Sequence, residues 1–400
     1  MPPARDTIRL ELLLRGGHVI DPLNGLNGPA DVAIAGDRIV AVGPDLPTAA
    51  AETVLDVTGY YVTAGLVDMH AHVFHTHRRS ALSLHPSVHT FSSGVTTVVD
   101  AGTSGWRDFA DFKAEVIDRV RIRVLAYVNI VGSGMGGEWE HDGREMRPKP
   151  AAAVAEEYAD VVVGIKTAHY WAKRPFDAEH PPWAAVEAAL EAGDLCGKPV
   201  MVDFFPWLPE RPYPELILEK LRPGDIHTHV FAEQFPVLDE QGKVYEHLFA
   251  ARARGVIFDL GHGAASFWFR QAIPAIAQGF VPDSISTDLH TGNLNGPVVD
   301  LLTTMSKVLN AGVALEDVIA RATVAPAREI GRPDLGTLSV GAEADVAVLA
   351  LEEGAFPFVD CGQTRLVGRH RLDCVLTMRS GKIVYNPHGL GLPNWEQAAT

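Results

Sequence analysis

Residues 64–72 read Ala64-Gly65-Leu66-Val67-Asp68-Met69-His70-Ala71-His72, an apolar run that ends in two histidines one residue apart. Side chains alternate along a β-strand, so His70 and His72 are expected to face the same way. Both imidazoles can then reach one cation, and neutral imidazole is a common ligand of zinc and related divalent metals. A lone His-x-His pair is weak evidence, but at the end of an apolar strand it predicts a metal site.

Runs of the same kind recur downstream. Continuous apolar runs are typical of parallel strands that are covered on both faces. Segments 108–120, 182–196 and 237–254 lie between runs and are rich enough in Ala, Glu and Leu to predict crossover helices. This alternation predicts an α/β protein with a (β/α)8 TIM barrel. The eight predicted strands are 62–69, 95–99, 124–128, 161–165, 199–202, 225–228, 256–260 and 284–287.

Polar residues of the kind that bind metals or substrates follow each predicted strand. The carboxyl ends of all strands in such a barrel point to one face, where active sites form. Chance placement would not give this regularity, so the strand ends predict a catalytic face. The residues are Asp68, His70 and His72; Asp100; Asn129; Lys166 and His169; Asp203; His229; His262; and Asp288 with His290.

The two ends of the chain have a different pattern. Residues 10–57 alternate short apolar runs with Gly and Asp turns, which indicates β-hairpins, and the same pattern returns after residue 335. The simplest architecture combines both ends into one small β-sandwich. We therefore expect a composite β-sandwich domain of residues 1–61 and 335–400, with the barrel, residues 62–334, inserted between its halves.

Composition argues against nucleic-acid-binding, membrane-spanning and disulfide-rich classes of protein. The chain has 400 residues, and Lys+Arg 34 against Asp+Glu 50 gives a net charge of −16, which argues against a nucleic-acid partner. No apolar run reaches the length of a membrane span, and the N-terminus lacks a secretory pattern. The three cysteines are far apart, which favours a reducing cytoplasm over a disulfide framework. We expect a cytoplasmic protein that acts on a small molecule and, on base rates, forms a homo-oligomer.

Lys166 ends the apolar run Val161-Val162-Val163-Gly164-Ile165. A lysine in that place is costly unless it is paired or modified. One interpretation is an ion pair with a nearby carboxylate. The other is that burial keeps the amine neutral, so that it takes up CO2 and becomes an anionic carbamate that can bind metals.

These motifs together resemble the amidohydrolase superfamily, in the branch of dihydroorotases, hydantoinases, D-aminoacylases and metal-dependent deacetylases. The resemblance spans about residues 10–385, and it is specific for the superfamily but not for a substrate. The matching segments, in chain order, are Gly65-Leu66-Val67-Asp68-Met69-His70-Ala71-His72, Ser93-Gly94-Val95-Thr96-Thr97-Val98-Val99-Asp100, Gly164-Ile165-Lys166, Thr228-His229, Ser286-Thr287-Asp288 and Gly336-Thr337-Leu338-Ser339-Val340-Gly341-Ala342-Glu343-Ala344-Asp345-Val346.

The resemblance implies a site with two divalent metal ions, zinc or manganese. His70 and His72 would hold the buried metal, carboxylated Lys166 would bridge the pair, and His229 would bind the exposed metal. Asp288 would contact the buried metal and act as the general base. In such a site a hydroxide between the metals attacks a polarised carbonyl, and Asp288 passes its proton to the leaving group.

One position departs from the family pattern. Asp203 follows the fifth predicted strand, where the family usually has a histidine that binds the exposed metal. A carboxylate can bind zinc at a similar distance, and it would favour a harder metal such as manganese. We take Asp203 as a ligand, with a mononuclear enzyme as the alternative.

His262, Asn129, His169 and His290 are the candidate substrate-binding residues, because each lies at or just beyond a strand end. The leading hypothesis is a metal-dependent hydrolase that cleaves an amide or ester acyl bond of an N-acyl amino acid, an acyl ester or a cyclic amide. A mononuclear deaminase is an alternative, although such enzymes usually lack the bridging lysine. A non-catalytic scaffold is another alternative, although only one of the six expected ligand positions differs, and it carries another residue type that can bind metal.

Overall fold

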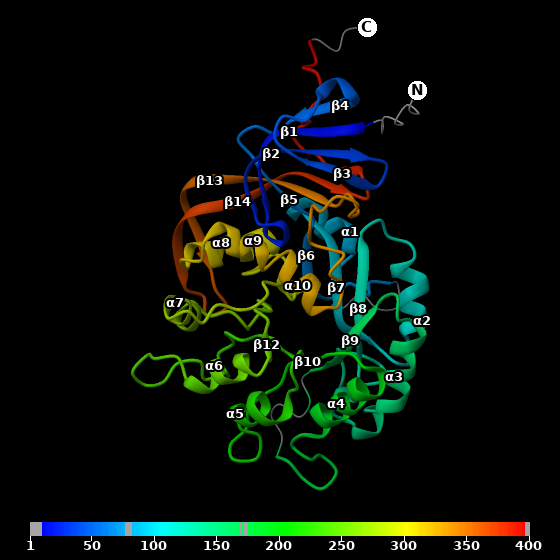
Figure 1. The fold of residues 1–400 in the computed structure, drawn as a ribbon. Coiled ribbons are helices and arrows are strands. Elements are labelled where there is room, and N and C mark those ends of the chain that lie inside the picture. Colours follow the sequence, from blue (N-terminus) through cyan, green and yellow to red (C-terminus); the bar gives the residue numbers. More distant parts are fainter. Residues whose placement is uncertain (1–9, 77–81, 169, 171–174, 397–400) are drawn as a thin grey trace.

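The computed structural model describes residues 10–76, 82–168, 170 and 175–396. Its strands form two sheets, one of eight strands and one of seven. The first and last described strands belong to the eight-stranded sheet, at the top of Figure 1, and the middle of the chain forms the parallel sheet and its helices below. The strand-rich ends and helix-rich middle agree with the sequence prediction.

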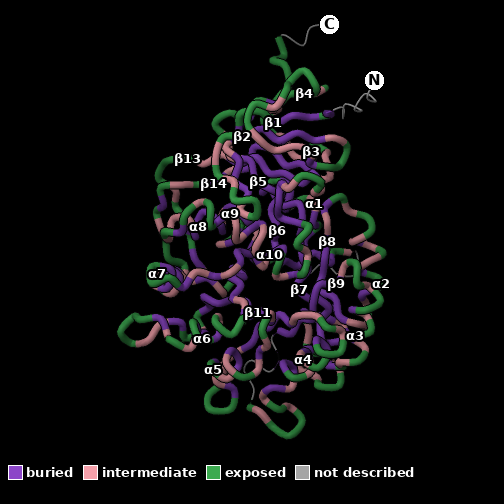
Figure 2. Tube along the Cα trace, in the orientation of Figure 1, coloured by how far each residue is buried: buried purple, intermediate pink, exposed green. Residues whose placement is uncertain are grey.

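The seven-stranded sheet is parallel, and its strands follow one another in chain order. Figure 2 shows that these strands are almost entirely buried, which explains their continuous apolar runs. Seven of the eight predicted barrel strands are therefore present as regular strands. They are β6 (Leu66–Ala71), β7 (Val95–Gly105), β8 (Arg123–Asn129), β9 (Val162–Thr167), β10 (Val200–Val202), β11 (Ile226–His227) and β12 (Ile257–Phe258).

The eighth strand was expected over residues 284–287, and residues 284–289 join the two edges of this sheet without forming a regular strand. Single bridges connect Ser284 to Asp259 and Leu289 to Ala71, which lie at opposite edges. The backbone N–H of Asp288 donates to the carbonyl of His70 at 2.6 Å. Asp288 has a φ of 49°, and this left-handed conformation interrupts the extended backbone that a regular strand needs.

Helices connect the strands and cover the sheet (Figure 1). The prediction of helix over 237–254 was partly wrong, because the helix occupies only the second half. Before it, the Asp239 side chain accepts from the N–H groups of Gln241 and Lys243 and forms a tight turn. The α-helices are α1 (Pro86–His89), α2 (Phe109–Phe112), α3 (Pro148–Glu157), α4 (Ala184–Cys196), α5 (Tyr213–Glu215), α6 (Glu246–Ala253), α7 (Phe269–Ala277), α8 (Leu301–Asn310), α9 (Leu315–Ala320) and α10 (Val324–Glu329).

The eight-stranded sheet combines strands from both ends of the chain, in the order β15-β14-β13-β5-β1-β2-β3 with β4 paired to β1. One edge of β1 pairs with β4 over residues 10–15 and with β5 over residues 18–20. The expected sandwich is thus one branched, hydrogen-bonded sheet rather than two separate ones. Its strands are β1 (Leu10–Asp21), β2 (Leu26–Ala35), β3 (Arg38–Gly43), β4 (Ala51–Asp56), β5 (Tyr61–Ala64), β13 (Val346–Val359), β14 (Arg365–Arg379) and β15 (Lys382–Tyr385).

Gly65 marks the passage from one sheet to the other. The predicted strand 62–69 divides there, because β5 belongs to the eight-stranded sheet and β6 to the parallel sheet. A side chain at Gly65 has no room, since an added Cβ would lie 2.2 Å from Oγ1 of Thr96. The Gly65 N–H donates to the carbonyl of Asp345, where the chain returns to the first sheet.

β13 and β14 form a long hairpin in the part of the chain where the sequence predicted only a return of the β pattern after residue 335. Its strands have 14 and 15 residues, and its tip reaches the loop that follows β12. There the N–H of Cys361 donates to the carbonyl of Phe267, and Asp360 accepts from the N–H of Phe269. The middle of the hairpin is largely exposed and charged, so its sequence lacks the apolar alternation of a half-buried strand.

Candidate metal centre

His70, His72 and Asp288 converge at the carboxyl end of the parallel sheet. One ligand atom from each residue lies within 4.8 Å of the other two. Nε2 of His72 is 2.9 Å from Oδ1 of Asp288, and Nε2 of His70 is 3.6 Å from the same oxygen. Two imidazoles and a carboxylate are a donor set that fits a divalent metal of the zinc type.

The opposite nitrogen of each site histidine is already occupied. Nδ1 of His229 is 2.6 Å from the carbonyl oxygen of Gly261, and only a protonated Nδ1 can donate to a carbonyl. Nδ1 of His72 is 2.7 Å from the Thr103 hydroxyl, and Nδ1 of His70 is 2.9 Å from the Thr228 hydroxyl. Each histidine therefore presents Nε2 as the atom available to a metal.

Lys166, in β9, has its side-chain amine buried near His70 and Asp288. Its side chain is 1% exposed, and Nζ has no hydrogen-bond partner among the described residues. Burial lowers the pKa of the amine, although the carboxylates of Asp203 and Asp288 oppose that shift. An unpartnered amine that burial shifts towards neutrality fits a lysine that is carboxylated in the mature site.

Asp203 and His229 form the other side of the centre. Oδ2 of Asp203 is 3.5 Å from Nε2 of His229, and the rings of His229 and His70 are 5.0 Å apart between centroids. Both side chains are buried. His229 has a φ of 64°, so it shares the left-handed backbone of Asp288, and such strain is concentrated at functional sites.

The pKa values of His70 and Asp288 are both below their ordinary values, and this leaves the two groups in different charge states. Burial, with a contribution from Lys166, lowers the pKa of His70 to about 3, so this imidazole is neutral and can bind a metal. Burial opposes ionisation of Asp288, but His70 and His72 outweigh it and hold the pKa of Asp288 below its usual range. A neutral imidazole beside an ionised carboxylate is the state that metal binding requires.

The predicted substrate-binding residues are placed as follows. The Asn129 amide donates to the carbonyl of Gly102 and accepts from the N–H of Val131, so both ends have partners in the chain. His262 is fully buried, with Nε2 2.7 Å from Nζ of Lys307. His290 accepts from the N–H of Gly292, and its ring lies 6.2 Å from that of His72. His169 lies outside the described residues, and substrate contact by these residues stays a prediction.

Sequence reasoning gave no role to Asp259, and it placed Asp68 at a strand end without a contact. Asp259 touches His70, and Asp68 accepts from the hydroxyl of Thr287 at 2.5 Å. Burial raises the pKa of Asp68 to about 7, even though hydrogen bonds from Thr287 lower it. A carboxylate inside an apolar run was the available signal at both positions.

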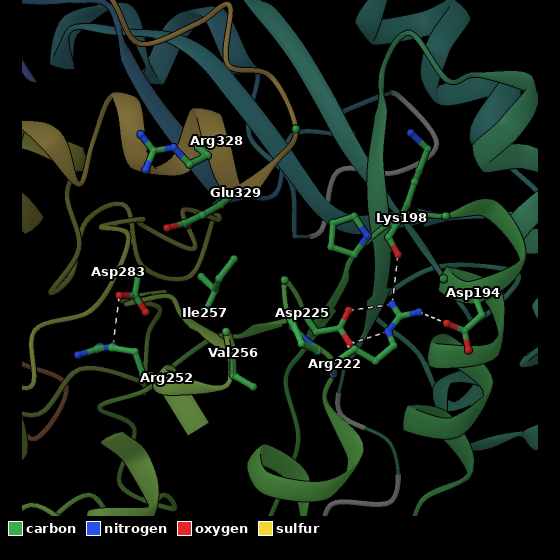
Figure 3. Close-up of a pocket in the computed structure, with 17 residues that line it drawn as sticks. Asp194, Lys198, Arg222, Asp225, Arg252, Val256, Ile257, Asp283, Arg328 and Glu329 are labelled. Atoms are coloured by element: carbon green, nitrogen blue, oxygen red, sulfur yellow. Dashed lines mark hydrogen bonds and ion pairs between the residues drawn. The ribbon is translucent and has the colours of Figure 1, made fainter. Parts of the chain in front are cut away.

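A cavity of about 770 Å³ lies at the other end of the barrel, before β10, β11 and β12 (Figure 3). Several of its charged groups pair with one another, as Arg222 does with Asp225 and Arg252 with Asp283. Its lining contains none of the predicted metal ligands. This cavity is therefore distinct from the metal centre.

Comparison with known proteins gives the family. The model of the Amidohydrolase family matches residues 269–384. A deacetylase from Enterococcus faecalis is 30% identical over 94% of this chain and 99% of its own length. The chain belongs to the amidohydrolase superfamily. The predicted resemblance is thereby confirmed.

Other members of this superfamily support the same placement. A deacetylase from Agrobacterium fabrum is 33% identical, over 82% of this chain and 80% of its own. The crystal structure of an adenine deaminase superposes with a TM-score of 0.85 at 29% identity, over 94% of this chain and 100% of that one. This amidohydrolase is an enzyme that hydrolyses carbon–nitrogen bonds. In the part of the chain that the structure describes, no helix combines the length and apolar character needed to cross a membrane.

Proposed function

We propose that this amidohydrolase cleaves an amide or ester acyl bond with two divalent metal ions, zinc or manganese. The observation that carries the proposal is the convergence of His70, His72 and Asp288 beside the unpartnered, buried amine of Lys166. His70 and His72 would hold one ion, and His229 and Asp203 the other. Carboxylated Lys166 would bridge them, and Asp288 would complete the first position.

The chain's own groups supply the proton transfer. A bound divalent ion would polarise the substrate carbonyl and lower the pKa of water. Asp288 is the one carboxylate of the described cluster that contacts both His70 and His72, and its side chain is 13% exposed at the mouth. It accepts a proton at a carboxylate oxygen and passes it to the leaving nitrogen or oxygen, as general acid–base catalysis requires.

The backbone holds this carboxylate in place. The Asn293 amide donates to the carbonyl of Asp288 at 2.6 Å, and the Asp288 N–H is bonded to His70. These two bonds fix the backbone from which the side chain projects, and the contact of Oδ1 with Nε2 of His72 at 2.9 Å orients the carboxylate itself. Such a fixed orientation favours one direction of proton transfer.

The substrate class rests on the relatives. Two deacetylases match most of the chain, so an acyl group on nitrogen or oxygen is the proposed target. N-acyl amino acids, acyl esters and cyclic amides all present the required carbonyl. The second candidate is deamination of a ring with a single metal ion. An adenine deaminase has a fold similar to that of this chain, and Asp203, in place of the usual histidine, would weaken the second metal position. The buried Lys166 favours the first candidate.

Metal removal tests the proposal. We expect metal analysis to find close to two zinc or manganese ions per chain. Chelation should abolish hydrolysis of acyl substrates, and metal added with bicarbonate should restore it, because the Lys166 carbamate needs CO2. Asp203→Asn should bind close to one ion, since it weakens the second position only.

The outcomes separate the alternatives. Asp194→Asn removes an exposed carboxylate at the far end of the barrel and should leave the metal content unchanged. One ion in both the natural protein and Asp203→Asn would favour the mononuclear enzyme. No bound metal and no recovery with bicarbonate would contradict hydrolysis and favour a scaffold.

A further inference from the structure

Asp259 is a fully buried carboxylate directly behind the metal ligand His70. It follows β12 and is 0% exposed. Its Oδ2 lies 3.4 Å from Nδ1 of His70, and among the described residues this is its one ion-pair contact. A buried carboxylate without an Arg or Lys partner is costly, so it needs other compensation.

Three hydroxyl groups supply that compensation. Oδ2 of Asp259 accepts from Thr228 at 2.7 Å and from Ser286 at 2.8 Å. Oδ1 accepts from Ser286 at 2.7 Å and from Ser284 at 3.1 Å. These donors come from the segment after β11 and from the segment that joins the sheet edges, so Asp259 is fixed from both sides.

The hydroxyl of Thr228 settles the protonation of His70. A threonine hydroxyl has one hydrogen, and an ionised carboxylate can only accept. The Thr228 hydrogen therefore goes to Asp259, and the same oxygen must accept from Nδ1 of His70 at 2.9 Å. His70 is held as the Nδ1–H tautomer, with the lone pair of Nε2 directed at the metal position.

The Nδ1 atoms of the other two histidines face different groups. His72 faces the hydroxyl of Thr103, and His229 faces the carbonyl of Gly261. A carboxylate behind an imidazole raises its basicity and fixes its orientation more strongly than a neutral oxygen does. His70 is thus a stronger donor than His229, whose Nδ1 faces only a neutral carbonyl.

We propose that Asp259 is a positioning residue that makes the His70–His72 position the tighter of the two metal positions. The inference rests on the proposed metal-dependent function and concerns only the affinity of one position. Asp259 acts through His70 and the Thr228 hydroxyl, and it does not touch the metal itself.

The test is Asp259→Asn, which keeps the shape of the side chain and removes its charge. Metal-free protein is titrated with Zn²⁺ against a competing chelator, and Co²⁺ is added separately to record its visible spectrum. We expect the dissociation constant of Zn²⁺ at the tighter position to rise on the order of 10- to 100-fold. The Co²⁺ bands should shift, because the donor strength and angle of His70 change.

Asp225→Asn is the matched control. Asp225 is equally buried, but it lies at the opposite end of the barrel and accepts from Val200 and Arg222. It should lower stability without changing the Zn²⁺ constant or the Co²⁺ spectrum. An equal loss of affinity in both variants would overturn the proposal, since the effect would then be general destabilisation.

A second variant tests the role of Asp259 in metal affinity if Asp259→Asn does not fold. Ser286→Ala removes the hydroxyl that contacts both oxygens of Asp259, and it should weaken the tight position several-fold. Natural protein that binds no Zn²⁺ would overturn the proposed function. Natural protein that binds Zn²⁺, with Asp259→Asn or Ser286→Ala binding it equally well, would overturn only the role of Asp259.

Discussion

Gly263 has a backbone conformation that favours glycine, and it lies against Asp288, the proposed general base. It has a φ of 54°, and an added Cβ would lie 2.6 Å from Oδ2 of Asp288. The loop after β12 can pass this close to the carboxylate only because no side chain is present. Glycine here leaves room for Asp288 to contact His72.

Gly263→Ala should therefore displace the general base. We expect kcat for an acyl substrate to fall on the order of 10- to 100-fold, because misplaced catalytic groups lose their alignment. Gly279→Ala is the control, since Gly279 also has a positive φ but has open space around it. Both should lose about 1 kcal/mol of stability, and equal turnover in the two variants would contradict the role of Gly263.

Individual residues also show what sequence reasoning could predict. His70, His72 and Asp288 were predictable because they follow apolar strands, and the resemblance pointed to the same three. The contacts of Asp259 and Thr228 with His70 were not predictable, because they join residues more than 150 positions apart. The pairing of His262 with Lys307 depends on α8, whose position no local pattern reveals.

Among the elements, the β13–β14 hairpin binds the two sheets together. At its tip Asp360 is buried, accepts from the N–H of Phe269 at 2.9 Å, and so satisfies the first turn of α7. Asp360 also accepts from Thr364 within the turn of the hairpin. The sequence pattern predicted β structure after residue 335 but not this hairpin, because solvent-facing strand pairs carry little apolar signal.

Asp360→Ala should destabilise the protein by about 2 kcal/mol, because two backbone donors lose a charged acceptor. Denaturant unfolding measures this change. Asp373→Ala, in the same hairpin, removes an exposed carboxylate paired with Arg371 and should cost less than about 0.5 kcal/mol. Equal losses would mean that the tip contact adds nothing.

Across the whole molecule, a charge cluster joins the barrel to the eight-stranded sheet. Arg123, which begins β8, pairs with Glu343 and with Asp345 at 2.8 Å. Arg379 of β14 pairs with the same two carboxylates. Burial would raise the pKa of Glu343, but a hydrogen bond from Ser380 and the charges of Arg123 and Arg379 lower it to about 2.

Arg123→Gln should cost about 2 kcal/mol at pH 7, because it leaves a partly buried carboxylate pair short of positive charge. The folded pKa of Glu343 lies below its unfolded value, so its contribution is complete above pH 4.5 and is lost as pH falls towards 2. The difference from the natural protein should shrink over that interval in urea unfolding. Arg144→Gln, at an exposed pair, should show a small difference at every pH.

The pairing of Ala64 with Val346 has a mechanical consequence. The chain leaves the eight-stranded sheet for the barrel and returns to it at adjacent strands, while the N- and C-terminal strands lie elsewhere in that same sheet (Figure 1). A pulling force applied to the two chain ends would pass through β1, β5, β13 and β14 before it reached any barrel strand. We therefore expect the eight-stranded sheet to carry tension on the ends of the chain before it reaches the candidate metal centre.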